Sequence, residues 1–143
     1  MRAPSPALVV DAAVLVAAAR GRSSGAVIAA ARSRILVTTD RAVQEARRRI
    51  ELGLKRPELL AIVDALAAEM TVVPVAALEP GLPAGARVLK EAVAARNGSV
   101  KDAHILSLAW TADADIWSSD RDFAGTGVAS WSTPNLMRGL AGA

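Results

Sequence analysis

Short apolar segments rich in Val, Ile and Leu alternate with helical segments along the whole sequence. Alternating strands and helices produce a parallel sheet with helices on both faces, because parallel strands need crossover connections. No repeat and no linker interrupts the pattern. The sequence therefore predicts an α/β fold, a single three-layer α/β/α domain over residues 1–143 with a parallel sheet of four to five strands. The predicted strands are residues 7–11, 35–38, 71–75, 114–118 and 128–131.

Several residues between and within these segments refine the prediction. Pro74 cannot donate to a strand ladder, so the third strand is predicted at an edge of the sheet. Asp40 is predicted to be the N-cap of the helix that follows the second strand. Residues 79–85 are rich in Pro and Gly and predict a loop. The segment 103–112 is apolar on nearly every face, which predicts a central, buried helix.

Composition excludes several classes of protein. The chain has no Cys and one His, which argues against a disulfide framework, a thiolate metal site and a histidine-based catalytic triad. Aromatic residues make up 3%, too few for base-stacking platforms.

The apolar run from Ala7 to Ala19 is interrupted by Asp11 and is too short to span a bilayer, so we expect a cytoplasmic protein without a membrane partner. A net charge of +3 slightly favours a polyanionic partner.

Acidic residues follow the ends of the predicted strands. Asp11 follows the first strand, and Asp120 and Asp122 follow the fourth. Glu45 lies in the second turn of the helix after the second strand. The carboxyl ends of parallel strands meet at one edge of the sheet, so these side chains are predicted to gather there. Asp102 lies at the start of the helix that leads to the fourth strand, a place that topology alone does not assign to that edge.

Converging carboxylates repel one another unless cations lie between them. Ligands that are all oxygen atoms suit Mg²⁺ or Mn²⁺. Two such ions about 3.5–4 Å apart activate water and stabilise the leaving oxygen during phosphodiester hydrolysis. The acids therefore predict a Mg²⁺ or Mn²⁺ site with hydrolytic chemistry.

Each acid also has a purely structural interpretation. Asp102 has the position of the partner in a helix capping box, and Glu45 lies roughly opposite the apolar stripe of its helix. Asp120 and Asp122 are residue types that form loops. Asp11 is the hardest to explain structurally, because an acid within an apolar core segment is costly unless it is paired or bound to metal.

Basic residues surround Glu45 on its helix. Arg41, Arg48 and Arg49 lie within one turn of it and are candidates for RNA phosphate binding, with a solvated basic face as the alternative. His104 lies on a mostly apolar helix, where a core or boundary histidine is the simpler interpretation.

Four segments together resemble the PIN-domain ribonucleases, the family that includes the VapC-type toxins. They are residues 8–15, the helix around Glu45, residues 101–109 and residues 118–123. The resemblance implies strand order 3-2-1-4-5 and RNA hydrolysis by metal-activated water. It implies that Asp11, Glu45, Asp102 and Asp120 are the catalytic residues and bind Mg²⁺ or Mn²⁺, with Asp122 in support. It also implies an antitoxin whose basic segment would block the acidic pocket, and a homodimer.

The sequence departs from the family pattern directly after Asp11. Ala12 and Ala13 stand where the family often has a hydroxyl residue and Asn. Ser118 stands where Thr is common and keeps the supporting hydroxyl. The departure favours an alternative, a catalytically weak or inactive PIN-like module that binds RNA or protein, whereas retention of the four acids argues against it. A stand-alone RNA-processing nuclease is a further alternative to a toxin.

Other doubly wound proteins fit less well. A phospho-receiver domain needs an Asp after the third strand, where this chain has Val75-Ala76-Ala77. A phosphatase of the haloacid dehalogenase type needs Asp-x-Asp, which Asp11-Ala12-Ala13 does not supply. Neither a dinucleotide-binding nor a P-loop fingerprint is present.

Overall fold

Five parallel strands form one sheet in the computed structural model, which describes residues 2–92, 100–119 and 123–142. The sheet order is β3-β2-β1-β4-β5, and each neighbouring pair is parallel. This confirms the predicted sheet and the order implied by the resemblance. The strands are β1 (Ala7–Val10), β2 (Ile35–Thr39), β3 (Thr71–Val73), β4 (Asp115–Trp117) and β5 (Ser130–Trp131).

The central strand β1 lies in the deepest part of the core. Val9 pairs with Val37 of β2 on one side and with Ile116 of β4 on the other. Leu8, Val9 and Val10 are fully buried, because strands flank them on both sides and helices cover both faces. At the edge, Pro74 follows β3 directly and ends it two residues earlier than predicted. The predicted edge position of this strand is confirmed.

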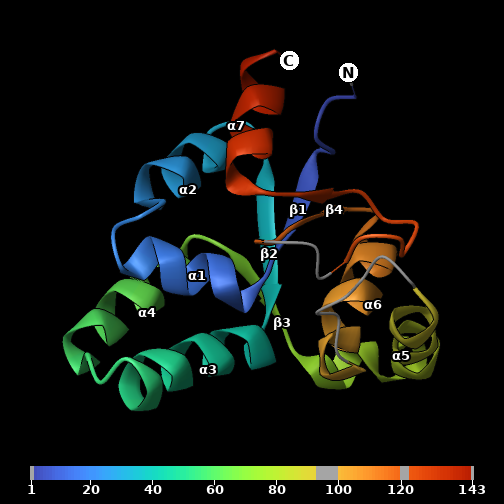
Figure 1. Cartoon of the computed structure of the whole chain (residues 1–143), viewed down its shortest axis with the longest axis horizontal. Coiled ribbons are helices and arrows are strands. Elements are labelled where there is room, and N and C mark those ends of the chain that lie inside the picture. The colour runs from blue at the N-terminus through green and yellow to red at the C-terminus, as the bar shows by residue number, and fades with distance from the viewer. Residues whose placement is uncertain (1, 93–99, 120–122, 143) are drawn as a thin grey trace.

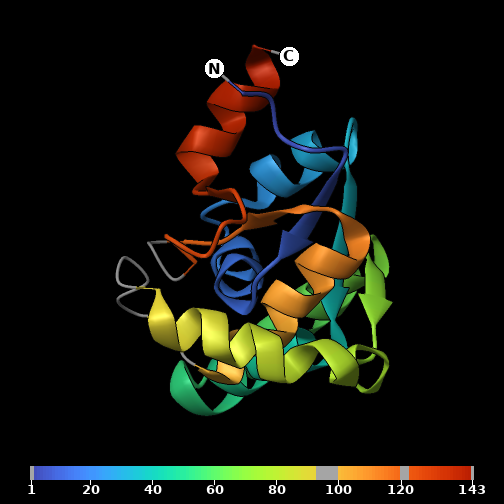
Figure 2. The same ribbon diagram turned by 90° about the vertical axis from the view of Figure 1, so that its right-hand side faces the viewer.

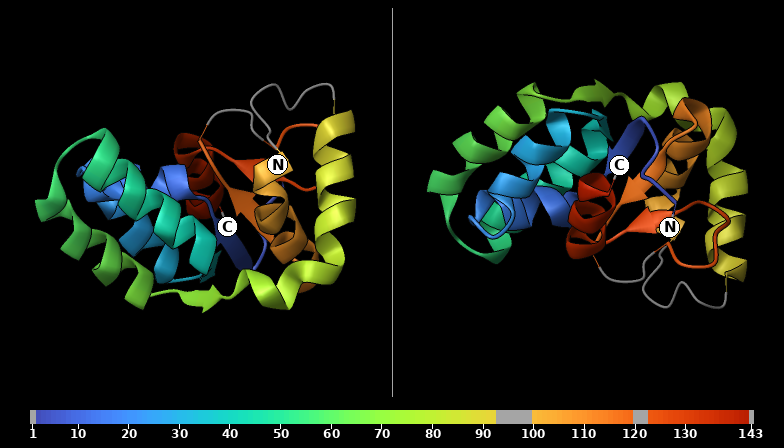
Figure 3. Two further views of the ribbon diagram at one scale, coloured as in Figure 1. Left: turned by 90° about the horizontal axis from the view of Figure 1, so that it is seen from below. Right: turned by 90° about the horizontal axis from the view of Figure 1, so that it is seen from above.

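Helices cover the two faces of the sheet unequally (Figures 1 and 3). One face carries α6 (Ala103–Ala112), with α5 (Leu82–Glu91) packed outside it. The other helices lie on the opposite side: α1 (Ala12–Ala19), α2 (Ser24–Ala31), α3 (Asp40–Arg48), α4 (Leu60–Ala68) and α7 (Thr133–Ala141). Shorter helical turns are η1 (Arg49–Gly53, a π-helix) and the 3₁₀ turns η2 (Pro57–Leu59), η3 (Val75–Gly81) and η4 (Val100–Asp102).

The helix α6 is the central helix that its composition predicted. Residues 103–109 are all buried, and the helix packs on β1, β2 and β4. α5 approaches it closely at Gly85, where a Cβ atom would lie 3.0 Å from the carbonyl oxygen of Ala103. Because α6 leads to β4, and β4 is parallel to β1, α6 begins near the carboxyl ends of the strands.

Two local predictions were wrong. The N-cap of α3 is Thr39, whose Oγ1 accepts a hydrogen bond from the Ala42 N–H at 2.9 Å, and Asp40 is the first helical residue. Residues 79–85 are helical rather than a loop, because η3 extends to Gly81 and α5 begins at Leu82. Pro83 lies in the first turn of α5, where a missing N–H costs nothing.

The two ends of the described chain lie at the same end of the molecule (Figure 2). A Cβ atom on Gly139 of α7 would lie 3.1 Å from the ring of Pro4, so the two segments are in close contact. Among the described helices, no single one is long and apolar enough to cross a membrane; α1 and α2 reach that size only as a pair bent by 118°.

Candidate active site

Asp11 lies where β1 ends and α1 begins, and it is the N-cap of that helix. Its Oδ1 accepts a hydrogen bond from the Ala12 N–H at 2.7 Å, and its Oδ2 accepts one from the Ser118 hydroxyl at 2.8 Å. Ser118 reaches Asp11 because β1 and β4 are parallel neighbours in which Val10 pairs with Trp117. Asp11 is 7% exposed, so the two donors partly replace the water that its charge loses on burial.

Glu45 lies on α3, which begins at the carboxyl end of β2. The Thr39 cap sets the direction of the first turn and places Glu45 in the second turn. The side chain of Glu45 is 37% exposed and accepts a hydrogen bond from Arg49, one turn further along, at 2.9 Å. It is therefore partly buried, not a fully solvated acid.

Asp102 is the N-cap of α6 and shares a cavity with Glu45. The cavity has a volume of about 250 Å³. Its lining comes from α3, from η4 and from the first turn of α6: Arg41, Gln44, Glu45, Arg48, Lys101, Asp102 and His104. The fold thus brings two of the predicted acids together, although the sequence pattern did not place Asp102 at this edge.

Within the described residues, Glu45 and Asp102 are the predicted acids that line the cavity. Asp120 and Asp122 lie outside the described residues. Asp11 is at the same sheet edge as the cavity but does not line it. Within the described residues, no group of three or more acidic or histidine side chains is placed to hold a metal ion. Two carboxylates on one cavity are oxygen donors of the type that Mg²⁺ and Mn²⁺ prefer.

Comparison with known proteins identifies the family. A family model described as PIN domain matches residues 9–141, which include both the sheet and the cavity. The chain belongs to the PIN-domain family. Members of this family are generally nucleases and typically use divalent metal ions.

A solved structure supports the fold of this PIN domain. The crystal structure of PAE2754 from Pyrobaculum aerophilum superposes with a TM-score of 0.66 and covers 95% of this chain and 90% of that one. The two sequences are 22% identical, so the likeness concerns the fold. A search of curated proteins found no match.

The cavity of this PIN domain carries positive charge beside its two acids. Arg41, Arg48 and Lys101 contribute to its lining. Of the three predicted RNA-binding arginines, Arg41 and Arg48 therefore reach the cavity, whereas Arg49 forms an ion pair with Glu45. Carboxylates and guanidinium groups together suit a ligand that brings both metal ions and phosphate.

His104 contributes a neutral imidazole to the cavity. It is 2% exposed, and its Nδ1 lies 2.8 Å from Thr39 Oγ1. Burial, assisted by the positive charge of Arg41 and opposed by Asp40, lowers its pKa to about 4. Thr39 Oγ1 accepts the Ala42 N–H, and the direction of its hydrogen bond with Nδ1 depends on the ring tautomer. The expectation of a core or boundary histidine is confirmed, and His104 also lines the cavity.

Two residues of this region were missed by the sequence analysis. Thr39 caps α3 and forms a hydrogen bond with His104. A hydroxyl residue directly before a helix is a common N-cap, so the capping role could have been predicted from the sequence. Gln44 lines the cavity three residues after Arg41 and four before Arg48, on the same face of α3. The spacing could be read from the sequence, but Gln44 is neutral, and the candidate site residues were chosen for their charge.

Proposed function

We propose that this PIN domain is a Mg²⁺- or Mn²⁺-dependent endoribonuclease. The observation that supports the proposal most is the shared cavity, in which Glu45 and Asp102 come from different helices and lie beside Arg41 and Arg48. In the proposal Asp11, Glu45, Asp102 and Asp120 are the catalytic acids, with Asp122 in support. The family membership supports nuclease chemistry in general.

In the proposed site, the acids bind the metal ion and the arginines bind the RNA phosphates. Asp11, Glu45, Asp102 and Asp120 would hold the metal, and Ser118 and the Ala12 N–H orient the carboxylate of Asp11. Bound Mg²⁺ or Mn²⁺ would supply charge stabilisation of the phosphate and activation of water. Arg41 and Arg48 bind the phosphate backbone and orient it toward the acids. His104, kept neutral by burial, adds no positive charge next to the metal ligands.

The test is RNA cleavage by purified protein with and without Mn²⁺. Asp102→Asn and Glu45→Gln are expected to lower the cleavage rate by about a hundredfold or more, because each removes a charged metal ligand. Asp64→Asn is the matched control, since Asp64 is an exposed acid on α4 that pairs with Arg47. The control should cleave like wild type. Absence of cleavage for varied RNAs, together with no Mn²⁺ binding in calorimetry, would refute the nuclease proposal.

We also propose the narrower role of a toxin in a toxin–antitoxin pair. It is supported by the resemblance of residues 8–15, the helix around Glu45, residues 101–109 and residues 118–123 to the PIN-domain ribonucleases, the family that includes the VapC-type toxins. The test is whether the reading frame next to this one encodes a short protein that binds the PIN domain and inhibits RNA cleavage. A neighbouring frame without such a product would favour a stand-alone RNA-processing nuclease.

A further inference from the structure

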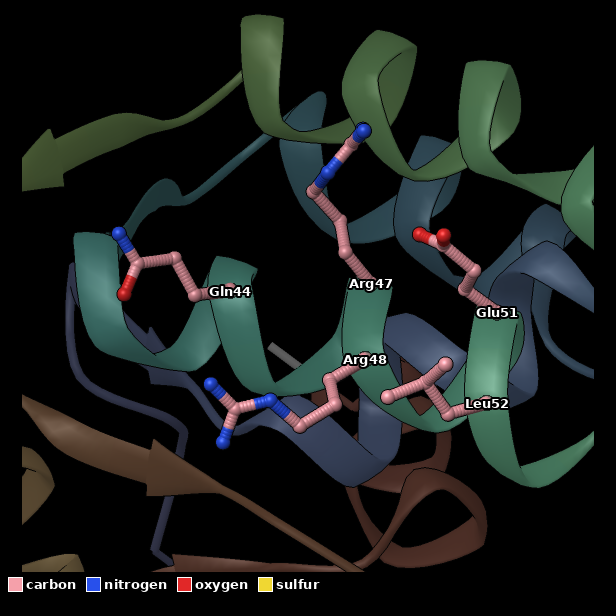
Figure 4. Close-up of a pocket in the computed structure, with 5 residues that line it drawn as sticks. All are labelled: Gln44, Arg47, Arg48, Glu51 and Leu52. Carbon is pink, nitrogen blue, oxygen red and sulfur yellow. The ribbon is translucent and has the colours of Figure 1, made fainter.

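A cavity beside β5 is separate from the site of the acids. Its volume is about 320 Å³, and its lining comes from the N-terminal segment, from β5 with the residue before it, and from α7: Arg2, Ala129, Ser130, Trp131, Asn135 and Arg138. None of these residues lines the cavity of Glu45 and Asp102 or the hollow along α3 and η1 that Figure 4 shows. We call this cavity the β5 pocket.

The backbone of β5 has one side that does not face the sheet. β5 is the last strand of the described sheet and pairs only with β4. The carbonyl oxygen of Ala129 accepts a hydrogen bond from the Ile116 N–H at 2.9 Å, and that of Trp131 accepts one from the Ser118 N–H at 3.0 Å. Successive residues of a strand direct their backbone groups to opposite sides, and an edge strand presents one set unpaired. Ser130, which is exposed, therefore directs its N–H and C=O away from β4.

Two arginines supply the charge of the β5 pocket. Arg2 forms an ion pair with Asp115 at 2.8 Å, although 64% of its side chain remains exposed. Arg138 is exposed and donates a hydrogen bond to the amide oxygen of Asn135. Arg138 forms no ion pair with the part of the chain that the structure describes. One of the two positive charges therefore remains available to an anionic ligand.

The charge of the pocket lies toward the amino end of β5. By the register of β4 and β5, Asp115 lies beside Ala129, the residue before β5. The hydrogen bond to Asp115 holds Arg2 at this end. Arg138 lines the same pocket from α7. An extended peptide that runs antiparallel to β5 would bring its own C-terminus to these two arginines.

We propose that the β5 pocket binds the acidic C-terminal segment of a partner protein, which joins the sheet as a strand antiparallel to β5. The backbone of the segment pairs with the N–H and C=O of Ser130, as in other complexes in which a peptide extends a sheet. Arg138 binds the terminal carboxylate, and the exposed N–H groups of Arg2 bind an acidic side chain near it. A free organic acid or inorganic phosphate has no backbone to pair with Ser130. The inference goes beyond the proposed nuclease function and uses none of its residues.

The experiment measures binding of the peptide Thr-Val-Thr-Val-Glu-Glu, labelled with fluorescein at its N-terminus, by fluorescence anisotropy with the whole protein. The β-branched residues favour an extended chain, and the last two residues supply the carboxylates. Arg138→Ala is expected to weaken binding about tenfold, the effect of losing one hydrogen bond to a charged group. A C-terminal amide on the peptide should weaken binding to wild type similarly. It should have little further effect on Arg138→Ala, because both changes remove the same contact.

Arg87→Ala is the matched control for the loss of charge. Arg87 is exposed on α5, which Figures 1 and 2 place away from α7, and it forms no ion pair with the described residues. The control should bind the peptide like wild type. Equal weakening by Arg87→Ala and Arg138→Ala, or no binding of the peptide by wild type, overturns the proposal.

Two N-methylated peptides test the pairing with β5. One is methylated at alternate backbone nitrogens and the other at the remaining ones, so that a single set of the missing donors faces Ser130. One peptide should bind like the unmodified peptide and the other more weakly. Equal affinity of the two overturns strand addition.

Competing ligands separate the peptide from other anions. Displacement of the labelled peptide by inorganic phosphate or single-stranded RNA at lower concentrations than by the unlabelled peptide would assign the β5 pocket to phosphate and overturn the proposal. Mn²⁺-dependent RNA cleavage should be the same in Arg138→Ala and in wild type. Loss of cleavage in a folded Arg138→Ala protein would contradict the separation of the pocket from the nuclease site, whereas absence of cleavage in every protein refutes the nuclease alone.

Discussion

At the scale of single residues, Ser118 and Asp11 form a hydrogen bond across 107 positions of the chain. Ser118 is fully buried, and it directs its hydroxyl to a carboxylate that is 7% exposed. A buried carboxylate that loses a donor keeps its charge but loses part of its solvation. Ser118 thus contributes to stability independently of any role in catalysis.

We predict that Ser118→Ala lowers the free energy of unfolding by about 1–3 kcal/mol, because it removes a buried hydrogen bond to a carboxylate. Ser118→Thr keeps the hydroxyl and should recover part of this loss, although its extra methyl group must fit a fully buried position. Urea denaturation monitored by circular dichroism measures both variants. Unchanged stability of Ser118→Ala would show that Asp11 does not depend on this hydrogen bond.

His104 makes stability depend on pH in a predictable direction. Burial lowers its pKa in the folded protein to about 4 from the ordinary value of 6.5, so the unfolded chain binds more protons between these values. The contribution of His104 is therefore fully present above pH 6.5 and is lost as the pH falls toward 4. From about pH 7 to about pH 5 the expected loss is about 2 kcal/mol.

The variant His104→Gln isolates this contribution, because acidic residues also titrate as the pH falls. Unfolding free energies of wild type and His104→Gln are measured by urea denaturation at about pH 7 and at about pH 5. The difference between the two proteins should shrink or reverse at the lower pH. A constant difference would mean that His104 titrates normally in the folded protein.

At the scale of elements, the hydroxyl of Thr39 joins two helices. It caps α3 by accepting the Ala42 N–H at 2.9 Å, and it contacts His104 of α6 at 2.8 Å. α3 carries Glu45 and α6 begins at Asp102, so this contact helps to fix the spacing of the two acids on the cavity.

We predict that Thr39→Ala lowers the free energy of unfolding by about 1–2 kcal/mol, because it removes an N-cap and a buried hydrogen bond together. Thr39→Ser retains the hydroxyl and should recover most of the loss. Thermal unfolding followed by circular dichroism gives the order of the three proteins. If Thr39→Ser is as unstable as Thr39→Ala, the methyl group rather than the hydroxyl is what the position requires.

The elements show which parts of the structure the sequence could predict. Short apolar segments predicted each strand that the structure describes, and Pro74 predicted that β3 lies at the edge, because both signals are local. The cap of α3 was misassigned to Asp40 because neighbouring Thr39 and Asp40 are both good capping residues. The shared cavity of Glu45 and Asp102 was less predictable, since it depends on how α6 packs across the sheet.

At the scale of the whole molecule, acids in different surroundings lie at opposite ends of the strands. Glu45 and Asp102 line the cavity near the carboxyl ends. Asp115 lies at the start of β4, is 3% exposed and joins the N-terminal segment to β5. Its carboxylate accepts hydrogen bonds from Arg2 at 2.8 Å, from the Ser5 N–H at 3.0 Å and from Trp131 Nε1 at 2.9 Å.

Removal of the charge of Asp115 and of Asp102 should therefore affect different properties. Asp115→Asn is expected to lower the free energy of unfolding by about 2–3 kcal/mol, because an amide is a weaker acceptor and its NH₂ group faces other donors. Asp102→Asn is expected to act on cleavage, because Asp102 shares the cavity with Glu45. Mn²⁺-dependent cleavage, measured at a temperature where both variants are folded, should be lost in Asp102→Asn and retained in Asp115→Asn. Loss of cleavage in folded Asp115→Asn would mean that the amino ends of the strands influence the site, and the division between a structural and a catalytic acid would be wrong.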